Sequence, residues 1–374
     1  MIGFDSLLQT PADWMRQGNV HADIVVTSRI RLARNILDQP FPGWGRKQEN
    51  EATLRIIQPA VESLPLLQNS FSRHLNKLTA IQKQALVERH LISREHAARA
   101  AGSAAVMNLP QTLSIMINEE DHLRMQAIQP GLALRESYAM LDQIDTELEK
   151  NLEFAFDKQL GYLTACPTNL GTGLRASAML HLPALMLSDQ VNQVIQAVNK
   201  IGLAVRGLYG EGTEALGNLF QVSNQTTLGD KEHEIIARLQ KVIEQIVNHE
   251  KNARQKLVSE NPTMLCDQVG RAYALLGHAH VMPSKEALNL ISMVRLGADL
   301  GFFPTEFRST LEALLMEIQP AHLQIRADRK LPTTERDQMR SQIIRDRLKS
   351  LQEPDISNAL DPPSAGPNST SNDS

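Results

Sequence analysis

The distribution of strand and helix patterns along the chain limits its fold more than any other feature of the sequence. Leu113, Ile115 and Ile117 alternate with their neighbours, and after an acidic interruption at 118–121 the stretch resumes as far as Ile128. Shorter apolar runs near 161–166, 202–208 and 218–223 also predict strands. After residue 230 the apolar residues recur at spacings of three and four, which predicts helices alone as far as about residue 351. This order indicates an α+β domain followed by an all-α domain.

A boundary between the two domains is predicted near residues 255–262, where Asn261 and Pro262 favour the end of a long helix over 230–259. The tail is rich in Pro, Ser, Asn and Asp and has no aromatic residue, which is typical of disorder. Further helices are expected at 49–68, 78–92, 132–152 and 186–200. The chain therefore divides into an N-terminal lead-in (1–22), a mixed domain (23–256), a helical domain (257–351) and a disordered tail (352–374).

The composition excludes several classes of protein. The 374 residues carry a formal net charge of −4, so no basic field is available to hold nucleic acid non-specifically. Cys166 and Cys266 stand far apart, which argues against a disulfide framework or a Cys-rich zinc site and favours a reducing compartment. Neither a signal-peptide pattern nor an apolar run of 18 residues occurs. We therefore expect a cytoplasmic protein that does not bind membranes.

Five arginines lie in short polar or glycine-containing segments rather than on helix faces: Arg29, Arg31, Arg124, Arg175 and Arg206. Scattered arginines are most often solvated surface charges. Their position beside turns and glycines instead suggests guanidinium groups that converge on the oxygens of one triphosphate. Neither a P-loop motif nor a kinase Gly-rich motif occurs, so an ATP site in this chain must be of another type.

Three glutamates are candidates for chemistry on a cationic substrate. Glu119 and Glu120 lie at the end of a predicted strand, and Glu211 lies in the segment YGEGTE. A solvated acidic turn would explain them equally well. If they converge, they can hold a planar guanidinium through paired hydrogen bonds and accept its proton. Cys166, followed by Pro and two glycines, is either a small buried hydrophobe or a thiol in an exposed functional loop.

Five segments together resemble the guanidino (phosphagen) kinase family, which includes the arginine and creatine kinases. They occur in the family's order and cover roughly residues 23–254. The resemblance implies an antiparallel sheet flanked by helices, with ATP held across the sheet. The segments are TSRIRLAR (27–34), NEEDHLR (118–124), CPTNLGTGLRAS (166–177), RGLYGEGTE (206–214) and VSNQTTLG (222–229).

The resemblance also implies roles for individual residues. Glu120 is expected to act as base and guanidinium clamp, with Glu211 as its partner and Cys166 beside the guanidinium. Glu119 is expected near Mg²⁺ through water, so the ATP phosphates rather than direct protein ligands hold the ion. The ATP-binding residues implied are the five arginines together with Thr27, Ser28, Ile30, His90, Ala176, Ser177, Ala178, Met179, Gly207, Leu208, Tyr209, Gly210 and Glu211.

Two departures from the small-molecule kinases point to a protein substrate. Only 26 residues precede Thr27, too few for the helical lobe that closes over a free guanidino compound, and a helical region follows residue 255. Both features resemble the bacterial McsB-type protein arginine kinases, which implies transfer of the ATP γ-phosphate to arginine in proteins. A small-molecule arginine kinase and a non-catalytic phosphoarginine-binding adaptor are the alternatives. The resemblance further implies a homodimer, a Clp-type AAA+ protease and an activator protein as partners in stress-linked protein turnover.

A segment of the helical domain, ERDQMRS, resembles the RDxxRA motif that forms an allosteric phosphoarginine pocket in those kinases. Arg336, Asp337 and Arg340 match the motif, and Ser341 stands in place of its Ala. A second interpretation is structural. Thr334 and Asp337 resemble a helix N-cap pair, and Arg336 and Arg340 form an i,i+4 pair on a charged helix.

Overall fold

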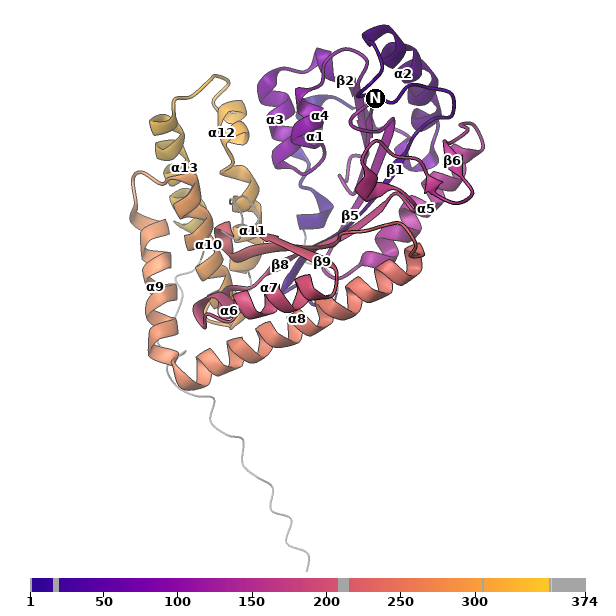
Figure 1. Ribbon diagram of the computed structural model, residues 1–374. Coiled ribbons are helices and arrows are strands. Elements are labelled where there is room, and N and C mark those ends of the chain that lie inside the picture. The colour runs from indigo at the N-terminus through magenta and orange to yellow at the C-terminus, as the bar shows by residue number, and fades with distance from the viewer. Residues whose placement is uncertain (1, 16–19, 208–214, 305, 350, 352–374) are drawn as a thin grey trace, which may run out of the picture.

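An eight-stranded sheet forms the centre of the computed structural model, which describes residues 2–15, 20–207, 215–304, 306–349 and 351. Every neighbouring pair of its strands is antiparallel. The expected antiparallel sheet flanked by helices is thereby confirmed (Figure 1). In spatial order the strands are β2 (Phe71–His74), β3 (Ala104–Met107), β4 (Leu113–Ile117), β5 (Leu123–Pro130), β1 (Val25–Arg34), β8 (Leu174–His181), β10 (Leu219–Asn224) and β9 (Leu203–Gly207).

The central strand β1 has a different character on each of its two sides. Ile30 and Leu32 are buried in the main hydrophobic core. Arg29 and Arg31 alternate with them and therefore point to the opposite side, because successive side chains of a strand alternate between faces. Since β1 pairs with β5 on one edge and with β8 on the other, this alternation carries a polar face into the middle of the sheet.

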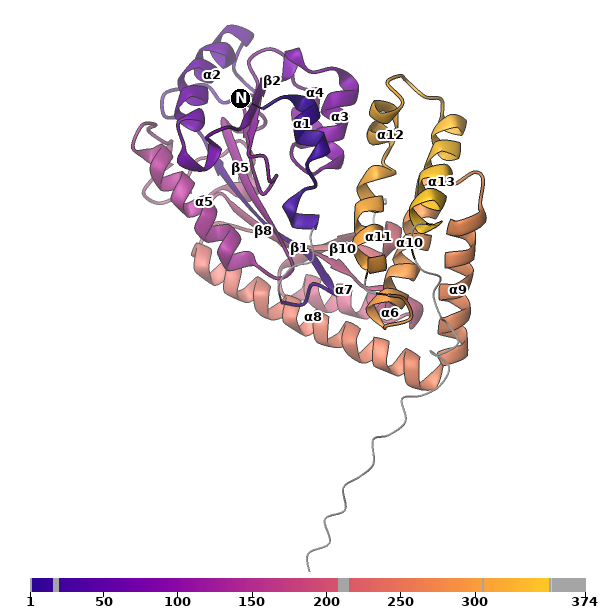
Figure 2. The same ribbon diagram turned by 180° about the vertical axis from the view of Figure 1, so that it is seen from behind.

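Helices cover the apolar face of the sheet (Figure 2). The longest of them, α8, packs on β8 and β10 and buries one apolar stripe that includes Ile235, Leu239, Ile243 and Ile246. The helix predicted over 230–259 is confirmed, because a spacing of three and four places these residues on one side. The covering helices are α2 (Lys47–Glu62), α5 (Leu134–Glu149), α7 (Val191–Lys200) and α8 (Glu232–Glu260), with the short α6 (Pro183–Leu187) against α8.

Short N-terminal elements cover one end of the opposite face. A second hydrophobic cluster holds them there, with Leu7, Phe71, Leu86 and Met116 among its members. The elements of this cluster are α1 (Phe4–Gln9), α3 (Ala80–Glu88) and α4 (Arg94–Ala98), whereas the 3-10 turn η1 (Asp13–Met15) belongs to a separate cluster with Ile128. Residues 1–22 are therefore more than a lead-in, because their described part packs on the sheet.

The helical domain lies beside the sheet (Figure 1). The chain leaves α8 at Glu260 and turns at once into α9, which runs in a different direction. No strand follows β10 in the residues that the structure describes, as the pattern predicted, and no helix in the same ranges is long and apolar enough to cross a membrane. The helices are α9 (Pro262–His278), α10 (Ser284–Asp299), α11 (Glu306–Glu317), α12 (Pro320–Arg326) and α13 (Thr333–Lys349).

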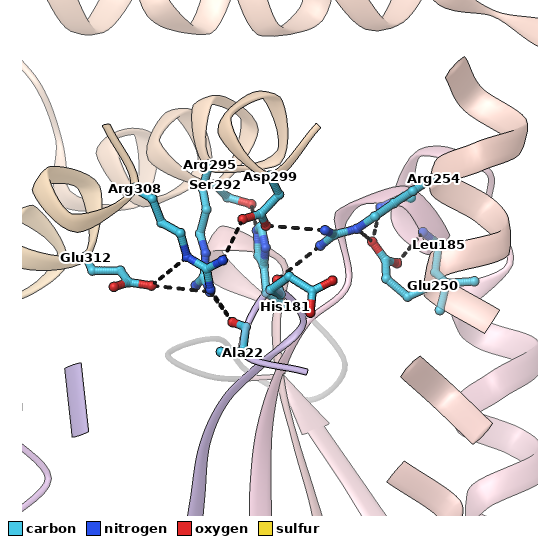
Figure 3. Close-up of polar contacts among 12 residues, drawn as sticks. Ala22, His181, Leu185, Glu250, Arg254, Ser292, Arg295, Asp299, Arg308 and Glu312 are labelled. Atoms are coloured by element: carbon cyan, nitrogen blue, oxygen red, sulfur yellow. Dashed lines mark hydrogen bonds and ion pairs between the residues drawn. The ribbon is translucent and has the colours of Figure 1, made fainter. Parts of the chain in front are cut away.

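A buried group of charged residues joins the helical domain to the end of the sheet (Figure 3). Arg254 of α8 donates to the Glu250 carboxylate at 2.9 Å and forms an ion pair with Asp299 of α10 at 3.3 Å. Arg308 of α11 pairs with the same Asp299 at 3.2 Å and donates to the carbonyl oxygen of Ala22. Three helices are therefore fastened to the segment that leads into the central strand.

The strand expected at 161–166 is wrong in length. Only Gly161–Tyr162 (β7) is extended and paired, with β6 (Phe156–Asp157). Gly161 has a φ of +75°, and a Cβ atom there would lie 2.5 Å from the carbonyl oxygen of Gly171. Two stretches of backbone therefore pack directly on each other at this short strand.

Candidate active site

Strand register gathers the five predicted arginines on one face of the sheet. Arg31 of β1 lies opposite Arg175 of β8. Arg124 of β5 lies opposite Ala33 of β1, which is two residues from Arg31 and therefore on the same face. Arg206 lies opposite Gln221, which continues the same face through β10. Residues directly opposite each other in antiparallel strands point to the same side. We call this side the arginine face, formed by Arg29, Arg31, Arg124, Arg175 and Arg206.

The arginine face holds more positive charge than its own residues neutralise. Burial, together with the charges of Arg124 and Arg175, lowers the pKa of Arg29 to about 10. Burial and the same neighbours, with Arg29, lower the pKa of Arg31 well below its usual value. The Nε atoms of Arg31 and Arg175 are buried without a hydrogen-bond acceptor in the described residues. Unpaired donors in a field of like charge fit a polyanionic ligand such as a triphosphate.

Glu119 neutralises one member of the arginine face. Its two carboxylate oxygens accept hydrogen bonds from Arg124 Nη1 at 2.8 and 2.7 Å, and one of them also accepts from Ser93 Oγ at 2.5 Å. Burial alone would raise the pKa of Glu119, but Arg124 and Ser93 outweigh burial and lower it. The carboxylate is therefore ionised and already occupied.

Glu120 lies in a different environment from its neighbour. Its side chain is half-buried, and no hydrogen bond to its carboxylate occurs in the described part of the chain. Burial raises the pKa of Glu120, and the charges of Asp121 and Glu119 raise it further. A carboxylate in this state can take up a proton closer to neutral pH than an ordinary glutamate can.

The loop that carries Cys166 is tied to the acidic turn. Asp121 accepts hydrogen bonds from the backbone N–H of Ala165 at 2.7 Å and from Asn35 Nδ2 at 2.6 Å. The Cys166 thiol is partly exposed and lies 3.0 Å from Thr168 Oγ1. The structure thus brings Cys166 to the same end of the sheet as Glu120.

A cavity extends from the arginine face toward the N-terminal segment. His90 lines it with a backbone φ of 58°, and its carbonyl accepts a hydrogen bond of 2.6 Å from Gln126. Burial and the charge of Arg29 lower the pKa of His90 to about 4, so its imidazole is neutral at physiological pH. The cavity is lined by Trp14, Thr27, Arg29, His90, Ile128, Ser177, Met179 and Gln221.

Four of the residues expected at the nucleotide have side chains on the helix-covered face of the sheet, opposite the arginine face. Ser28 donates to the carbonyl of Gly131 at 2.8 Å and accepts from the N–H of Ala133 at 3.0 Å, on the side of α5. The other three are buried in the main core beneath the helices, namely Ile30, Ala176 and Ala178. The matching motifs are contiguous, whereas only alternate side chains of a strand lie on the arginine face.

The predicted segment RGLYGEGTE (206–214) lies only partly within the described residues. Arg206 and Gly207 end β9, with Arg206 exposed at the rim and Gly207 opposite Phe220. The residues that follow lie outside the described residues, namely Leu208, Tyr209, Gly210 and Glu211.

Two polar residues of the site were missed. Gln221 accepts a hydrogen bond of 3.1 Å from Arg29 Nη2, and Trp14 meets the ring of His90 edge-on at 5.6 Å. The strand predicted at 218–223 contained the signal for Gln221, because its alternation fixes which side chains share a face. No local pattern indicated Trp14, because tertiary packing alone brings the N-terminal segment onto β5.

The predicted phosphoarginine segment lies on α13, and its residues have internal partners. Arg340 is 1% exposed and donates to the carbonyls of Ile318 at 3.0 Å and Met282 at 2.8 Å. It also donates to Asp337 at 2.5 Å, whereas Arg336 donates to the carbonyl of Leu331. Ser341 donates to the carbonyl of Ala279. The helix begins at Thr333, so the proposed N-cap at Thr334 is wrong.

Two family models match this chain. The ATP:guanido phosphotransferase C-terminal catalytic domain matches residues 54–253, and the protein-arginine kinase McsB C-terminal domain matches residues 262–359. The protein-arginine kinase of Symbiobacterium thermophilum is 45% identical over 353 residues, which cover 93% of this chain and 100% of that protein. That of Moorella thermoacetica is 45% identical over 344 residues, which cover 91% and 98%.

Solved structures of guanidino kinases have a similar fold. Lombricine kinase is 28% identical with a TM-score of 0.55, and the alignment covers 65% of this chain and 70% of that one. The duplicated taurocyamine kinase from Schistosoma mansoni with bound transition state analogue components is 26% identical with a TM-score of 0.56, covering 72% and 39%.

Proposed function

Since this chain belongs to the protein-arginine kinases of the ATP:guanido phosphotransferase family, we propose that its arginine face binds ATP and that Glu120 activates the arginine side chain of a protein substrate. One observation carries the assignment. Partly buried arginines, two of which have a buried Nε donor without an acceptor in the described residues, lie on the same sheet as a carboxylate of raised pKa. A cationic surface suits the phosphates, and a carboxylate able to take up a proton suits the acceptor.

In the proposed reaction a guanidinium nitrogen of the substrate attacks the γ-phosphorus. The N–P bond forms, the bond from phosphorus to the bridging oxygen breaks, and that oxygen leaves with ADP. The substrate guanidinium is protonated at any working pH, so its nitrogen becomes nucleophilic only as a proton leaves. Glu120 accepts that proton. Meanwhile the arginine face neutralises the charge that develops on the transferred and leaving oxygens.

Mg²⁺ is proposed to enter with ATP. Both oxygens of Glu119 already accept hydrogen bonds from Arg124, so this carboxylate is suited to contact the ion through water. No group of three His, Cys, Asp or Glu side chains with metal-binding geometry occurs in the described ranges. The ligands of Mg²⁺ would then be phosphate oxygens and water, as is usual for this ion at nucleotides.

A direct assay tests the function. The protein is incubated with Mg²⁺, ATP and an unfolded protein, and mass spectrometry detects acid-labile phosphate on arginine. We expect modified arginine with the parent and none above background with Glu120→Gln. Free arginine in a parallel incubation tests the small-molecule alternative. Rapid phosphorylation of free arginine without modified protein would overturn the proposal, and phosphoarginine binding without any transfer would favour the adaptor.

We also propose a homodimer that contacts through α9. Met264 and Leu275 are 38% and 47% exposed and lie three turns apart on one side of this helix. Light scattering of the parent and of a Met264→Glu/Leu275→Glu double variant tests this contact, and a monomeric parent would exclude it. A cytoplasmic location, a Clp-type AAA+ protease that receives the modified proteins and an activator protein remain proposals from the family resemblance.

An allosteric phosphoarginine pocket at Arg336, Asp337 and Arg340 is a further proposal. A phosphorylated arginine would have to compete with the internal partners of Arg340 and would meet Arg336 nearer the surface. Activity measured with and without added phosphoarginine tests the pocket. Equal stimulation of the parent and of Arg336→Ala would leave it without support.

A further inference from the structure

We infer that Trp14 is a specificity-determining residue for the nucleotide base, and that its Nε1–H donates a hydrogen bond to a ring nitrogen of adenine. The inference rests on the proposed ATP site of the arginine face. It assigns to the N-terminal segment a part of the site that no matching motif contains.

The position of Trp14 is the first observation. The 3-10 turn Asp13–Met15 packs over β5 and β1 on the arginine-face side, and the Trp14 ring contacts Ile128. The same ring lies edge-on to His90 at 5.6 Å, and both line the cavity that begins at Arg29. Trp14 is therefore a wall of the cavity that opens onto the proposed phosphate site.

The hydrogen bonding of Trp14 is the second observation. The side chain is 6% exposed, and its Nε1 atom is buried without an acceptor in the described ranges. An indole N–H can only donate, and buried donors in native proteins nearly always have a partner. An acceptor from a bound molecule would satisfy this one.

Strand register fixes which end of a nucleotide reaches Trp14. Arg29 lies opposite Ser177, and one step of two residues along β1 brings Thr27 opposite Met179, about 7 Å away. Arg31 lies one step in the other direction. Phosphates held by Arg29 and Arg31 therefore point the rest of the nucleotide toward Thr27, Met179 and Trp14.

The chemistry of that end suits a purine. Ile128 and Met179 supply apolar walls for a flat ring, and His90 is neutral because of its lowered pKa. An adenine ring presents acceptor nitrogens at its edge, which a donor-only indole recognises. Arg29 is the one cation of the arginine face among the residues that line this cavity, so its far end suits the base better than the phosphates.

Trp14 also packs against Ala12 and against Met316 of α11, so a purely structural role must be separated from base recognition. The chain offers a matched control, because its other tryptophan, Trp44, is 89% exposed. The test compares parent, Trp14→Phe and Trp44→Phe by calorimetric titration with Mg²⁺–ADP and with Mg²⁺–tripolyphosphate. Phenylalanine keeps an aromatic ring but has no donor.

We expect Trp14→Phe to bind ADP roughly 3- to 10-fold more weakly, the effect of one neutral hydrogen bond, and tripolyphosphate with parental affinity. Trp44→Phe should bind both like the parent. Equal loss of affinity for the two ligands in Trp14→Phe, or none for either, would overturn the inference. A parent that binds neither ligand would instead overturn the proposed ATP site, so the two failures are distinguishable.

Deaza analogues identify the acceptor. The 1-, 3- and 7-deaza forms of ADP each replace one ring nitrogen by C–H. One of them should bind the parent more weakly than ADP does but bind Trp14→Phe as well as ADP does, because the variant has already lost that bond. The same losses in parent and variant for all three analogues would exclude a hydrogen bond from Trp14 to the ring.

Discussion

The carboxylate of Asp121 accepts a hydrogen bond of 2.7 Å from the backbone N–H of Ala165. This single bond links the turn that carries Glu120 to the loop that carries Cys166. The two proposed contacts of a substrate guanidinium therefore share one support, although they are far apart in the sequence.

Asp121→Ala should lower kcat roughly 10- to 100-fold with little effect on ADP affinity. Asp121 lies outside the arginine face, and a shift of about 1 Å between reacting groups is enough for such a loss. Steady-state phosphorylation and calorimetric titration measure the two quantities. Asp142→Ala, on the exposed side of α5, is the control. A parental kcat in Asp121→Ala would mean that the loop keeps its position without this bond.

Glu120→Gln should lower the transfer rate by roughly 10²–10⁴ and leave ADP affinity unchanged, because the amide keeps the shape but cannot accept the proton. Since the pKa of Glu120 is raised, the parental rate should fall on acidification at a higher pH than an ordinary glutamate would give. A rate within threefold of the parent would remove Glu120 from the mechanism.

The same substitution should raise the melting temperature at pH 7.5. A raised folded pKa means that the folded state binds the proton more tightly than the unfolded chain. The stabilising contribution is thus present below the unfolded pKa and is lost as pH rises through the folded pKa. The advantage of Glu120→Gln over the parent should disappear near pH 4. Calorimetric melting at both pH values checks the sign.

Arg31→Met should stabilise the protein without nucleotide and abolish its response to ADP. Arg31 is partly buried beside Arg29, Arg124 and Arg175, which lowers its pKa, so an apolar side chain of similar length relieves repulsion. Melting curves with and without Mg²⁺–ADP test this, since ADP at 100 times its Kd stabilises a binding protein by about 2.7 kcal/mol. Arg55→Met, on an exposed side of α2, should keep the parental response.

Arg254→Met should cost about 3–5 kcal/mol of unfolding free energy, because it leaves the Glu250 and Asp299 carboxylates buried without this partner. Adding Glu250→Gln should recover part of that loss, since the unpaired charge is then gone. Urea denaturation gives the free energies. A cost below about 1 kcal/mol for the single change would show that water or movement of the helices relieves the charges.

Arg340→Ala should lower the unfolding free energy by at least about 1–3 kcal/mol, because the carbonyls of Ile318 and Met282 lose their donor. Arg336→Ala should stay within about 0.5 kcal/mol of the parent, as its side chain lies nearer the surface. Arg336→Ala is thus the variant with which to test regulation. Equal stability of the two variants, measured by thermal melting, would contradict the buried role of Arg340.

Periodicity predicted the large elements well. The apolar stripe of α8 and the alternation of β4 and β5 exceed any competing pattern, so their positions were accurate to a few residues. The strands β2 and β3 have four residues each, too few for a periodic signal. Tertiary pairing alone makes them strands.

The candidate site was predictable as a set of residues but not as a geometry. Sequence segments indicated all five arginines, whereas the same segments also included Ser28 and Ile30, which face the core. The pairing of Glu119 with Arg124, five residues apart, depends on the turn between β4 and β5. Trp14 could be assigned to the site only from the folded structure, because no pattern in its own segment relates it to His90.

The pairing of β1 with β5 and β8 fixes a strand register in which every second residue of β1 lies on the arginine face. Arg31 faces Arg175 only while the strands keep their present register. A one-residue insertion in β1 before Arg31 would turn Arg31 toward α5 and bring Leu32 to the face that is proposed to bind ATP. Folding and catalysis would fail together, so a change of length is far more damaging within these central strands than in loops in general.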